Sequence, residues 1–498
     1  MRICFSELLF CIGVTMTHIC RTAGLLIATP VAYALAQGAQ QQGHNLSARL
    51  DPTTTSAAAK AEFLSGLDDW QNQSYTAGEQ HFRRAIALDS TFGLAYVFAG
   101  AIPPRSLEAL RSEELDRGVA LAARASTAEG LLALAWREKA GNRFRRAAQL
   151  LHDAMELLPD EPRFASEYVW ALIAADDKSA LDSVRAYRKR FPSFPPLCFP
   201  LSYLLTARGD SAEALAVAEE YTRLAPQLPA SFAYYGRALQ IRGRYADAEA
   251  QYRQALALAH AGPDYPFDAR SSLAELYELQ GRSADARTIA MQGIARAVDA
   301  TDSALYMSVA AGTSILAGDQ RRALSLLASA REKSQFTGNT ASLPIDVLLA
   351  QAHALFGDRR AVPTYLARLP IINPIDSSNA LVWRAVAYAY AGQLDSAMAY
   401  ADHLIAGATP ETQWRTTWAH VARGLAHREK RQCAQALEEL RKSDSTLVDV
   451  QAALADCESQ LGNRAAAVVW RDRVLARREL RLISPAQMYA RARMKQMK

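Results

Sequence analysis

The sequence predicts an all-α fold: a right-handed superhelical solenoid of about twelve helical hairpins over residues 57–483, followed by a basic capping helix over residues 484–498. Similar segments recur along the chain at intervals of 31 to 39 residues, clustered about 34. Within them glycine, aromatic residues and alanine return at matched offsets, which a bundle merely rich in alanine would not produce. One hairpin cannot bury its apolar face alone, so the hairpins are expected to stack, with the first helix of each pair lining a concave face.

The clearest copy of the repeat covers residues 229–255. It places aromatic, small, apolar or turn-forming residues at positions 4, 8, 11, 15, 17, 20, 24 and 27, which are Phe232, Gly236, Leu239, Gly243, Tyr245, Ala248, Tyr252 and Ala255. This pattern resembles the tetratricopeptide repeat, a helix–turn–helix unit of about 34 residues. Gly236 and Ala248 are expected where two helices cross closely, and Gly243 is expected to end the first helix in a left-handed turn.

The resemblance provides a frame for the rest of the chain. Repeat starts are expected near residues 59, 93, 128, 161, 195, 229, 267, 304, 343, 378, 417 and 448. The second copy, which contains Pro103 and Pro104, is weak, as are the fourth and the ninth, the latter near Pro363 and Pro370. Nine copies are clear from the pattern, and twelve is the number that the frame predicts.

Composition and charge exclude several classes of protein. Half of the 498 residues are hydrophobic, 21% are charged and the mean hydropathy is -0.10, which excludes wholesale disorder, collagen and a multispanning membrane protein. The net charge is +5; residues 464–498 contribute +8, so the remainder is slightly acidic at -3. No nucleic-acid partner is expected, because the basic residues gather at one end instead of along a face. A solvated cationic helix is favoured there, with binding of a membrane surface or an anion as the alternative.

The N-terminal segment is typical of a secretory signal. About a dozen apolar or small residues follow Arg21 and end in the triplet Ala-Leu-Ala. This order predicts a signal peptide over residues 1–36, and a flexible leader rich in Gln, Gly, Ser and Thr over residues 37–56. Either Met1 or Met16 is the start. The mature chain is expected to be exported, periplasmic or secreted, without a transmembrane span.

The last helix is expected to cap the solenoid, whose final hairpin would otherwise expose an apolar face. Ser484 and Pro485 are typical of an N-cap and a first helical residue. The arginines of this helix are expected to stay in solvent while its apolar residues cover that face, namely Met488, Tyr489, Ala492 and Met494.

Two cysteines are brought together by the repeat frame. Cys433 falls at position 17 of its repeat and Cys457 at position 10 of the next, near the same end of adjacent hairpins. In an oxidising compartment we expect a disulfide between them, and two buried free thiols are the alternative. The sequence has no CxxC motif, so neither a zinc ribbon nor thioredoxin chemistry is indicated.

The sequence carries none of the motifs that mark common catalytic and nucleotide sites. Phosphate-binding loops of the GxxxxGK[ST] and GxGxxG types, HExxH, GxSxG and the protein-kinase motifs are all missing. His403, His420 and His427 form the one local histidine group, without cysteines or carboxylates at the spacing of a metal site. The longest irregular stretch, residues 101–127, is too short for a catalytic domain. We therefore expect a non-enzymatic chain without a metal or a cofactor.

The resemblance implies a protein-interaction scaffold, because tetratricopeptide arrays typically bind extended or helical segments of other proteins in their concave groove. The groove positions are residues 2, 5, 9, 12 and 13 of each first helix. On the fifth to seventh repeats, they select as partner-binding residues Tyr203, Thr206, Arg237, Gln240, Ser271, Glu275 and Glu278. Aromatic and polar side chains suit peptide recognition. The alternative is that some of these residues pack between repeats.

Two other functions stay open, and one subfamily is disfavoured. The Lys and Asn clamp of chaperone-binding arrays is missing, since positions 5 and 9 hold residues such as Phe63 and Leu67. Residues 61–96 also resemble the repeat regions attached to bacterial protein kinases and winged-helix regulators, which makes a sensory or docking module one alternative. The other is a glycan- or small-ligand-binding protein of the cell envelope, which the missing lipoprotein cysteine and the regular repeats disfavour.

Overall fold

The computed structural model describes residues 49–72, 74–101, 108–141, 143–175, 177–208, 210–259, 269–297, 300–333, 345–369, 374–409 and 412–497. Within these ranges the chain is helical and contains no strand, so the predicted all-α class is confirmed. The predicted signal peptide (residues 1–36) and most of the predicted leader lie outside the described residues.

The helices of the first half of the chain are α2 (Ala57–Gln71), α3 (Tyr75–Leu88), α4 (Gly93–Ala101), α5 (Glu108–Ala122), α6 (Thr127–Ala140), α7 (Phe144–Leu157), α8 (Arg163–Ala174), α9 (Ala180–Arg190), the short η1 (Pro195–Leu197), α10 (Cys198–Arg208), α11 (Ser211–Leu224), α12 (Pro229–Ile241) and α13 (Tyr245–Leu258). Those of the second half are α14 (Ala269–Leu279), α15 (Ser283–Arg296), α16 (Ala300–Leu316), α17 (Gln320–Lys333), α18 (Ile345–Phe356), α19 (Val362–Leu366), α20 (Pro374–Tyr390), α21 (Leu394–Ala406), α22 (Trp414–Glu429), α23 (Cys433–Arg441), α24 (Val448–Gln460), α25 (Arg464–Leu475) and α26 (Pro485–Gln496).

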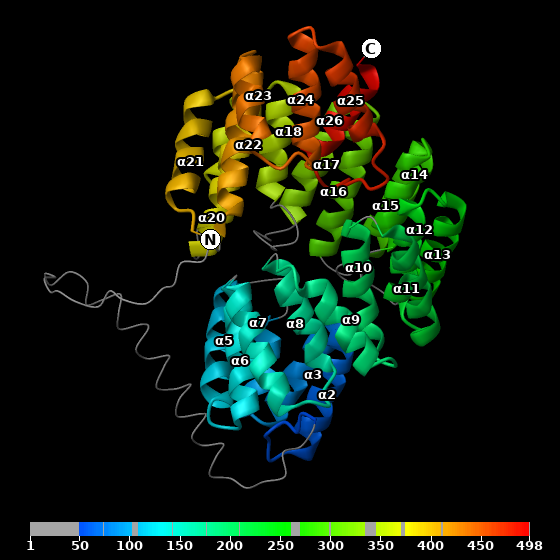
Figure 1. Cartoon of the computed structure of the whole chain (residues 1–498), viewed down its shortest axis with the longest axis vertical. Coiled ribbons are helices and arrows are strands. Elements are labelled where there is room, and N and C mark those ends of the chain that lie inside the picture. Colours follow the sequence, from blue (N-terminus) through cyan, green and yellow to red (C-terminus); the bar gives the residue numbers. More distant parts are fainter. Residues whose placement is uncertain are drawn as a thin grey trace, which may run out of the picture.

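Consecutive helices pair into hairpins, from α2 with α3 to α24 with α25. The first helices of neighbouring pairs also touch one another, as α12 touches α10 and α14, so the first helices form one layer and the second helices another. Each first helix begins within four residues of a repeat start expected from the sequence. Figure 1 shows the hairpins following one another from α2 and α3 at the bottom to α24 and α25 at the top. The number twelve and the right-handed sense stay predictions.

Glycines set the closeness of the two helices within a hairpin. A Cβ atom at Gly236 on α12 would lie 2.8 Å from the ring of Tyr252 on α13, and one at Gly66 on α2 would lie 2.7 Å from the ring of Phe82 on α3. Both pairs join position 8 to position 24 of the repeat. The aromatic ring therefore fills the space that the missing side chain leaves, in agreement with the predicted close crossing at Gly236.

The turn after the first helix also agrees with the sequence pattern. Gly243 has φ +78°, the left-handed conformation expected at this position, and five further glycines in the described part of the chain share a positive φ. In the hairpin of α22 and α23 the same conformation is taken by Arg431, with φ 59°.

Two weak repeats depart from the regular form. The stretch 101–127, expected to be irregular, contains the helix α5 (Glu108–Ala122), which pairs with α4; Pro103 and Pro104 lie outside the described residues. In the ninth repeat the second helix, α19 (Val362–Leu366), has only five residues. Pro363 stands in the first turn of α19, where proline is tolerated. In the interior of a longer helix a proline would remove a backbone hydrogen bond and break the helix.

The end of the predicted flexible leader contacts later hairpins. Leu50 is buried, and its backbone N–H donates to Glu161 Oε2 (3.3 Å) just before α8. Thr53 N–H donates to Glu129 Oε1 (3.1 Å) in the first turn of α6. Ser56 caps α2 by accepting a hydrogen bond from the N–H of Ala59. Residues 50–56 thus lie along the N-terminal ends of several first helices.

The close helix crossing gives a matched prediction on α13. Ala248 is fully buried against α12, whereas Ala250, two residues later, is exposed. We expect Ala248→Val to lower the free energy of unfolding by about 1–3 kcal/mol, because the added methyl groups force the helices apart. Ala250→Val should lower it by only about 0.5 kcal/mol through helix propensity. Urea unfolding followed by circular dichroism measures both, and equal effects of the two substitutions would contradict the close crossing.

Candidate functional site

Residues 477–483, called the tail segment below, connect α25 to α26 and cross the first helices in the middle of the chain. This segment is not helical. Leu480 (8% exposed) and Leu482 (4% exposed) belong to one hydrophobic cluster with Leu239 of α12 and Leu273 of α14. In Figure 1 the red chain between α25 and α26 descends toward α15 and α16. The C-terminal part of the protein therefore occupies the layer where the groove was predicted.

Side chains predicted to bind a partner make the polar contacts to this segment. Gln240 Nε2 donates to the carbonyl oxygen of Arg478 (2.8 Å), and Arg237 forms an ion pair with Glu479 (2.6 Å). Arg478 in turn donates from Nη1 to the carbonyl oxygen of Ile241 at the end of α12 (3.0 Å). Two of the predicted groove residues are thus engaged by the chain itself.

Glu275 on α14 is the third predicted groove residue at this place. Its Oε1 accepts hydrogen bonds from Gln240 Nε2 (3.0 Å) and from the backbone N–H of Leu480. Burial raises the pKa of its carboxyl group from the usual 4.5 to about 7, although the nearby Arg237 acts in the opposite direction. Gln240 is itself held by the hydroxyl of Tyr252, which donates to Gln240 Oε1 (2.9 Å).

A glycine on α16 makes room for the tail segment. A Cβ atom at Gly312 would lie 1.9 Å from the carbonyl oxygen of Leu482 and 2.7 Å from its carbonyl carbon. The nearest atoms to that position all belong to Leu482. Gly312 is therefore required by the close approach of the tail-segment backbone.

The last helix begins at the expected residues but does not act only as an end cap. Ser484 Oγ accepts a hydrogen bond from the N–H of Gln487 (3.4 Å), and Pro485 is the first helical residue. Besides α24 and α25, α26 contacts α16 and α18, and Met488 and Met494 are each 1% exposed. The chain turns inward after α25 and places this helix between distant hairpins.

Arg491 of α26 was expected in solvent and is buried instead. Its guanidinium donates to the carbonyl oxygens of Val474 (2.9 Å) and Leu475 (3.1 Å) in the last turn of α25. The carbonyl groups that end a helix have no partner within it, so a buried arginine can satisfy them and keep its own donors paired.

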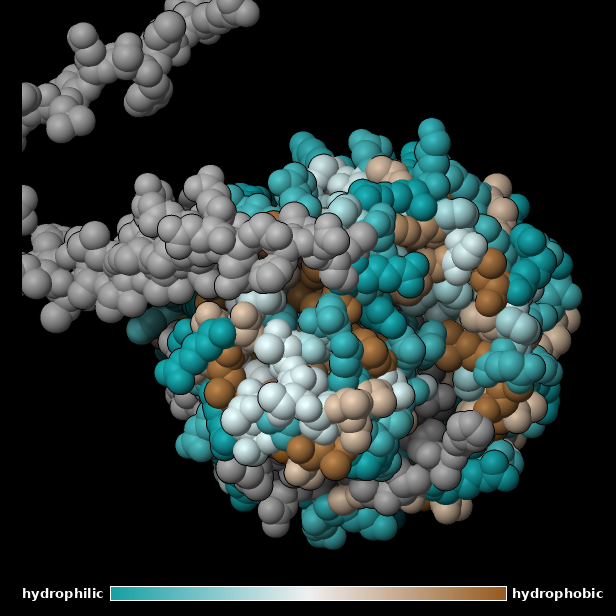
Figure 2. Space-filling view, turned by 90° about the horizontal axis from the view of Figure 1, so that it is seen from below, coloured by the Kyte–Doolittle hydropathy of each residue, from teal (hydrophilic) through white to brown (hydrophobic). Residues whose placement is uncertain are grey.

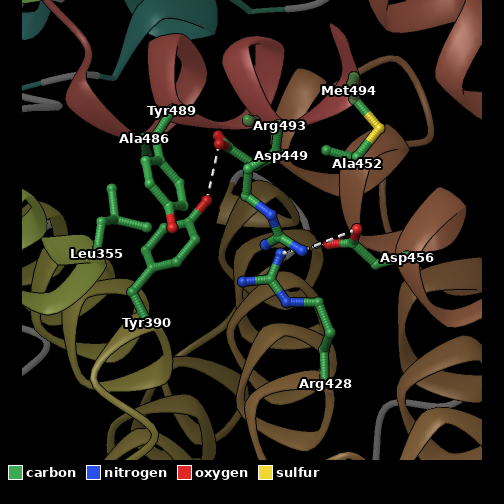
Figure 3. Close-up of a pocket in the computed structure, with 11 residues that line it drawn as sticks. Leu355, Tyr390, Arg428, Asp449, Ala452, Asp456, Ala486, Tyr489, Arg493 and Met494 are labelled. Atoms are coloured by element: carbon green, nitrogen blue, oxygen red, sulfur yellow. Dashed lines mark hydrogen bonds and ion pairs between the residues drawn. The ribbon is translucent and has the colours of Figure 1, made fainter. Parts of the chain in front are cut away.

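Polar contacts join the first helices α20, α22 and α24 to one another, and α24 to α26 (Figure 3). Tyr390 of α20 donates its hydroxyl to Asp449 Oδ1 of α24 (2.7 Å), and Asp456 of α24 lies 3.0 Å from Arg493 of α26 and 3.6 Å from Arg428 of α22. Burial raises the pKa of both aspartates. The cavity among these residues measures about 10 Å³, which is room for one water molecule. The arrangement fixes α26 and has no space for a larger ligand.

The other predicted groove residues have different surroundings. Tyr203 on α10 is 47% exposed, and its ring centroid lies 5.6 Å from that of Trp170 on α8. Thr206, one turn further along α10, and Ser271 on α14 are half-buried. Glu278 is buried; it accepts a hydrogen bond from Ser283 Oγ (2.8 Å), and burial raises its pKa. Glu278 therefore contacts its own hairpin, whereas Tyr203 is open to solvent.

Sequence reasoning missed the tail segment. One signal was available, because Leu480 and Leu482 are separated by a charged residue in a stretch without helical periodicity. Alternating apolar and charged residues are typical of an extended chain with one buried face. The positive charge of the surrounding residues instead favoured a solvated end.

The histidines singled out in the sequence have separate surroundings. His420 faces Glu439 (2.8 Å) and His427 faces Gln432 (2.8 Å), so the two histidines have separate partners. Across the described ranges no group of three His, Cys, Asp or Glu residues is placed to hold a metal ion. No helix in this part of the protein is long and apolar enough to cross a membrane.

Cys433 and Cys457 face each other between adjacent hairpins. Their sulfur atoms lie 2.6 Å apart, both residues are buried, and both are free thiols in the structure. Burial raises the pKa of the Cys457 thiol. The disulfide stays a prediction.

No protein-family model and no curated protein matches the chain. Among solved structures, human IFIT1, a dimer with PPP-AAAA, is 14% identical with a TM-score of 0.38 and covers 82% of this chain and 94% of its own. A tetratricopeptide protein of Thermus thermophilus is 24% identical with a TM-score of 0.31, and the match covers 36% of this chain and 96% of that protein. One from Parabacteroides merdae is 10% identical with a TM-score of 0.33, and the match covers 57% of this chain and 96% of that protein.

Likenesses of this degree carry no argument on function. The paired helices of the chain, the crossing at Gly236 and the turn at Gly243 agree with the repeat pattern expected from the sequence.

Glu275 predicts a pH dependence of stability. Its carboxyl group faces Arg237, Glu479, Tyr252 and Arg491, and its pKa is about 7 in the folded chain against 4.5 when unfolded. Between these values the folded state binds more protons, so the free energy of unfolding falls as the pH rises from about 4.5 to about 7. Glu275→Gln should reduce this slope, to which Glu278, Asp449 and Asp456 also contribute, and stabilise the protein above pH 7 by about 1–3 kcal/mol.

Urea unfolding at a series of pH values measures the Glu275 effect. The control is Asp247→Asn, which replaces an exposed carboxylate on α13 and should leave the slope between pH 4.5 and 7 in place. An unchanged slope in Glu275→Gln would contradict the assignment.

The cysteine pair predicts a redox-dependent stability. After air oxidation, peptide mapping by mass spectrometry under non-reducing conditions should show a peptide that links Cys433 to Cys457, while Cys198 stays alkylable in the unfolded chain. The 24-residue separation corresponds to a stabilisation of about 3 kcal/mol in the loop-entropy description. Full alkylation of Cys433 and Cys457 without reductant would contradict the disulfide.

Proposed function

We propose that this chain is a non-enzymatic, exported scaffold that docks segments of partner proteins on the face formed by its first helices. The observation that carries the proposal is Tyr203, a large side chain that is 47% exposed on a first helix. It occupies the repeat position that Arg237 occupies one hairpin later, and Arg237 contacts the tail segment. Tyr203 therefore belongs to the same inner row, at a place where the ring is open.

The surroundings of Tyr203 favour contact with a peptide. Trp170 and Phe199 stand beside it. The ring centroids of Trp170 and Phe199 lie 4.8 Å apart, and the ring of Phe199 stacks on that of Tyr234 with a centroid distance of 3.8 Å. Neighbouring rings restrict the motion of an exposed tyrosine, so little conformational entropy is lost when a partner covers it. Aromatic side chains with this arrangement provide a large contact area for an extended or helical segment.

The rest of the surface gives no comparable site on the face seen in Figure 2. There the hydrophobic residues form small groups separated by hydrophilic ones. Leu88 on α3 and Met291 on α15 are exposed on second helices, Val468 and Val469 form an exposed pair on the second helix α25, and Trp414 is 38% exposed at the start of the first helix α22. Single exposed apolar residues are normal on a protein surface, so they indicate no partner.

Substitution of Tyr203 tests the proposal. We expect Tyr203→Ala to weaken capture of specific partner proteins from envelope and secreted fractions at least tenfold, since truncation of a central aromatic contact costs about 2 kcal/mol or more. Met291→Ala is the matched control, because Met291 is 44% exposed on a second helix. Quantitative mass spectrometry of the captured proteins measures both variants, and equal capture by wild type and Tyr203→Ala would contradict the proposed docking face.

A further inference from the structure

We infer that the tail segment is an intramolecular ligand: it occupies a peptide site on α12, α14 and α16 that recognises a non-helical segment with an acidic residue followed by leucines at alternate positions. A partner segment of this chemistry binds there in place of the tail. The inference rests on the proposed scaffold function and specifies the partner for one part of its inner face.

The contacts have the form of peptide recognition by side chains of a groove. Gln240 and Glu275 bind backbone groups of the segment, at the carbonyl of Arg478 and the N–H of Leu480. These two contacts hold the backbone of the segment whatever its side chains are. The main-chain polar groups of an extended segment must find such partners when they leave water.

Sequence preference comes from three side chains of the segment. Glu479 pairs with Arg237, and Leu480 and Leu482 are buried among apolar residues of the first helices. Arg478 and Arg481 are exposed. The N–H of Ser484 donates to the carbonyl oxygen of Arg481 (2.8 Å), and this turn holds Leu482 in the groove beside Leu480 while Arg481 stays in solvent.

The helix crossing inside the hairpin of α12 and α13 does not use the tail segment. Within the hairpin of α12 and α13, the crossing is made by Gly236, Ala248 and Tyr252, none of which belongs to the tail. The segment is a non-helical connection between two helices, and it lies more than 200 residues from Gln240 and Glu275 along the chain. Its place on α12, α14 and α16 can therefore be taken by another chain without unfolding these hairpins.

Covalent attachment gives the tail an advantage over a free peptide. A tethered segment has an effective concentration in the millimolar range, so a competitor of equal intrinsic affinity binds weakly while the tail is docked. Weakening the tail alone should therefore raise the apparent affinity of a free peptide, because the fraction of open sites increases.

Three full-length proteins test the inference by fluorescence anisotropy with a labelled peptide of residues 476–484. The wild type should bind this peptide weakly. The double variant Leu480→Ser/Leu482→Ser should bind it at least about tenfold more tightly, because its own tail no longer fills the site. Adding Gly312→Ala should abolish this gain, since a Cβ atom there meets the backbone of Leu482 in the tail and in the peptide alike. A peptide with serine at both leucine positions is the matched control.

A second measurement does not depend on the leucine variants folding. Arg237 and Glu479 are both 42% exposed at the side chain, so their charges can be exchanged without changing the apolar packing. Arg237 also faces Glu275, whose pKa is about 7, so the proteins are compared at a pH of about 6, where Glu275 is mostly protonated. Hydrogen exchange of residues 476–484 should be slow in the wild type, at least about tenfold faster in Arg237→Glu, and slow again in Arg237→Glu/Glu479→Arg. Equal exchange in the three proteins would overturn the inference.

The outcomes separate this inference from the proposed function. Equal peptide binding by wild type and the leucine variant overturns the intramolecular ligand, whereas the Tyr203-dependent capture of partners would still support a scaffold. Light scattering tests whether the tail binds a second copy of the chain instead. A wild-type dimer that dissociates in the leucine variant would place the tail on the second copy and overturn the intramolecular site.

Discussion

The close crossing of two helices inside each hairpin is the constraint on which the rest of the structure depends. Gly66 lies against Phe82, Gly236 against Tyr252, and a Cβ at Gly424 would lie 2.5 Å from the side chain of Leu440. In all three pairs the second residue follows the first by the same sequence distance. Because the crossings are alike, successive hairpins stack with their first helices in one row, and groove positions of successive repeats lie side by side.

This regularity explains which features the sequence alone could predict. The repeat frame placed the first helices within four residues and located the turn at Gly243, since both follow from small residues at fixed offsets. It also selected Arg237, Gln240 and Glu275 as residues on one face. Their actual contact, the tail segment, is more than 200 residues away, and no local periodicity encodes a contact over that distance.

The differences between the sequence analysis and the structure have local causes. Arg491 was expected in solvent because of its charge, but the free carbonyls at the end of α25 offer it partners in the interior. Residues 101–127 were expected to be irregular because of two prolines, yet α5 (Glu108–Ala122) follows them. Glu278 was expected to face a partner and instead accepts a hydrogen bond from Ser283, at the start of the next helix.

The tail segment changes the mechanical character of the array. In an open solenoid each repeat contacts only its neighbours, so stability is a sum of local terms. Here α26 contacts α16 and α18 together with α24 and α25, and Arg478 reaches the end of α12. These contacts couple the sixth to ninth hairpins to the last one. The same segment that fills the groove therefore also closes this half of the array on itself, and a partner that took its place would loosen the array while it bound.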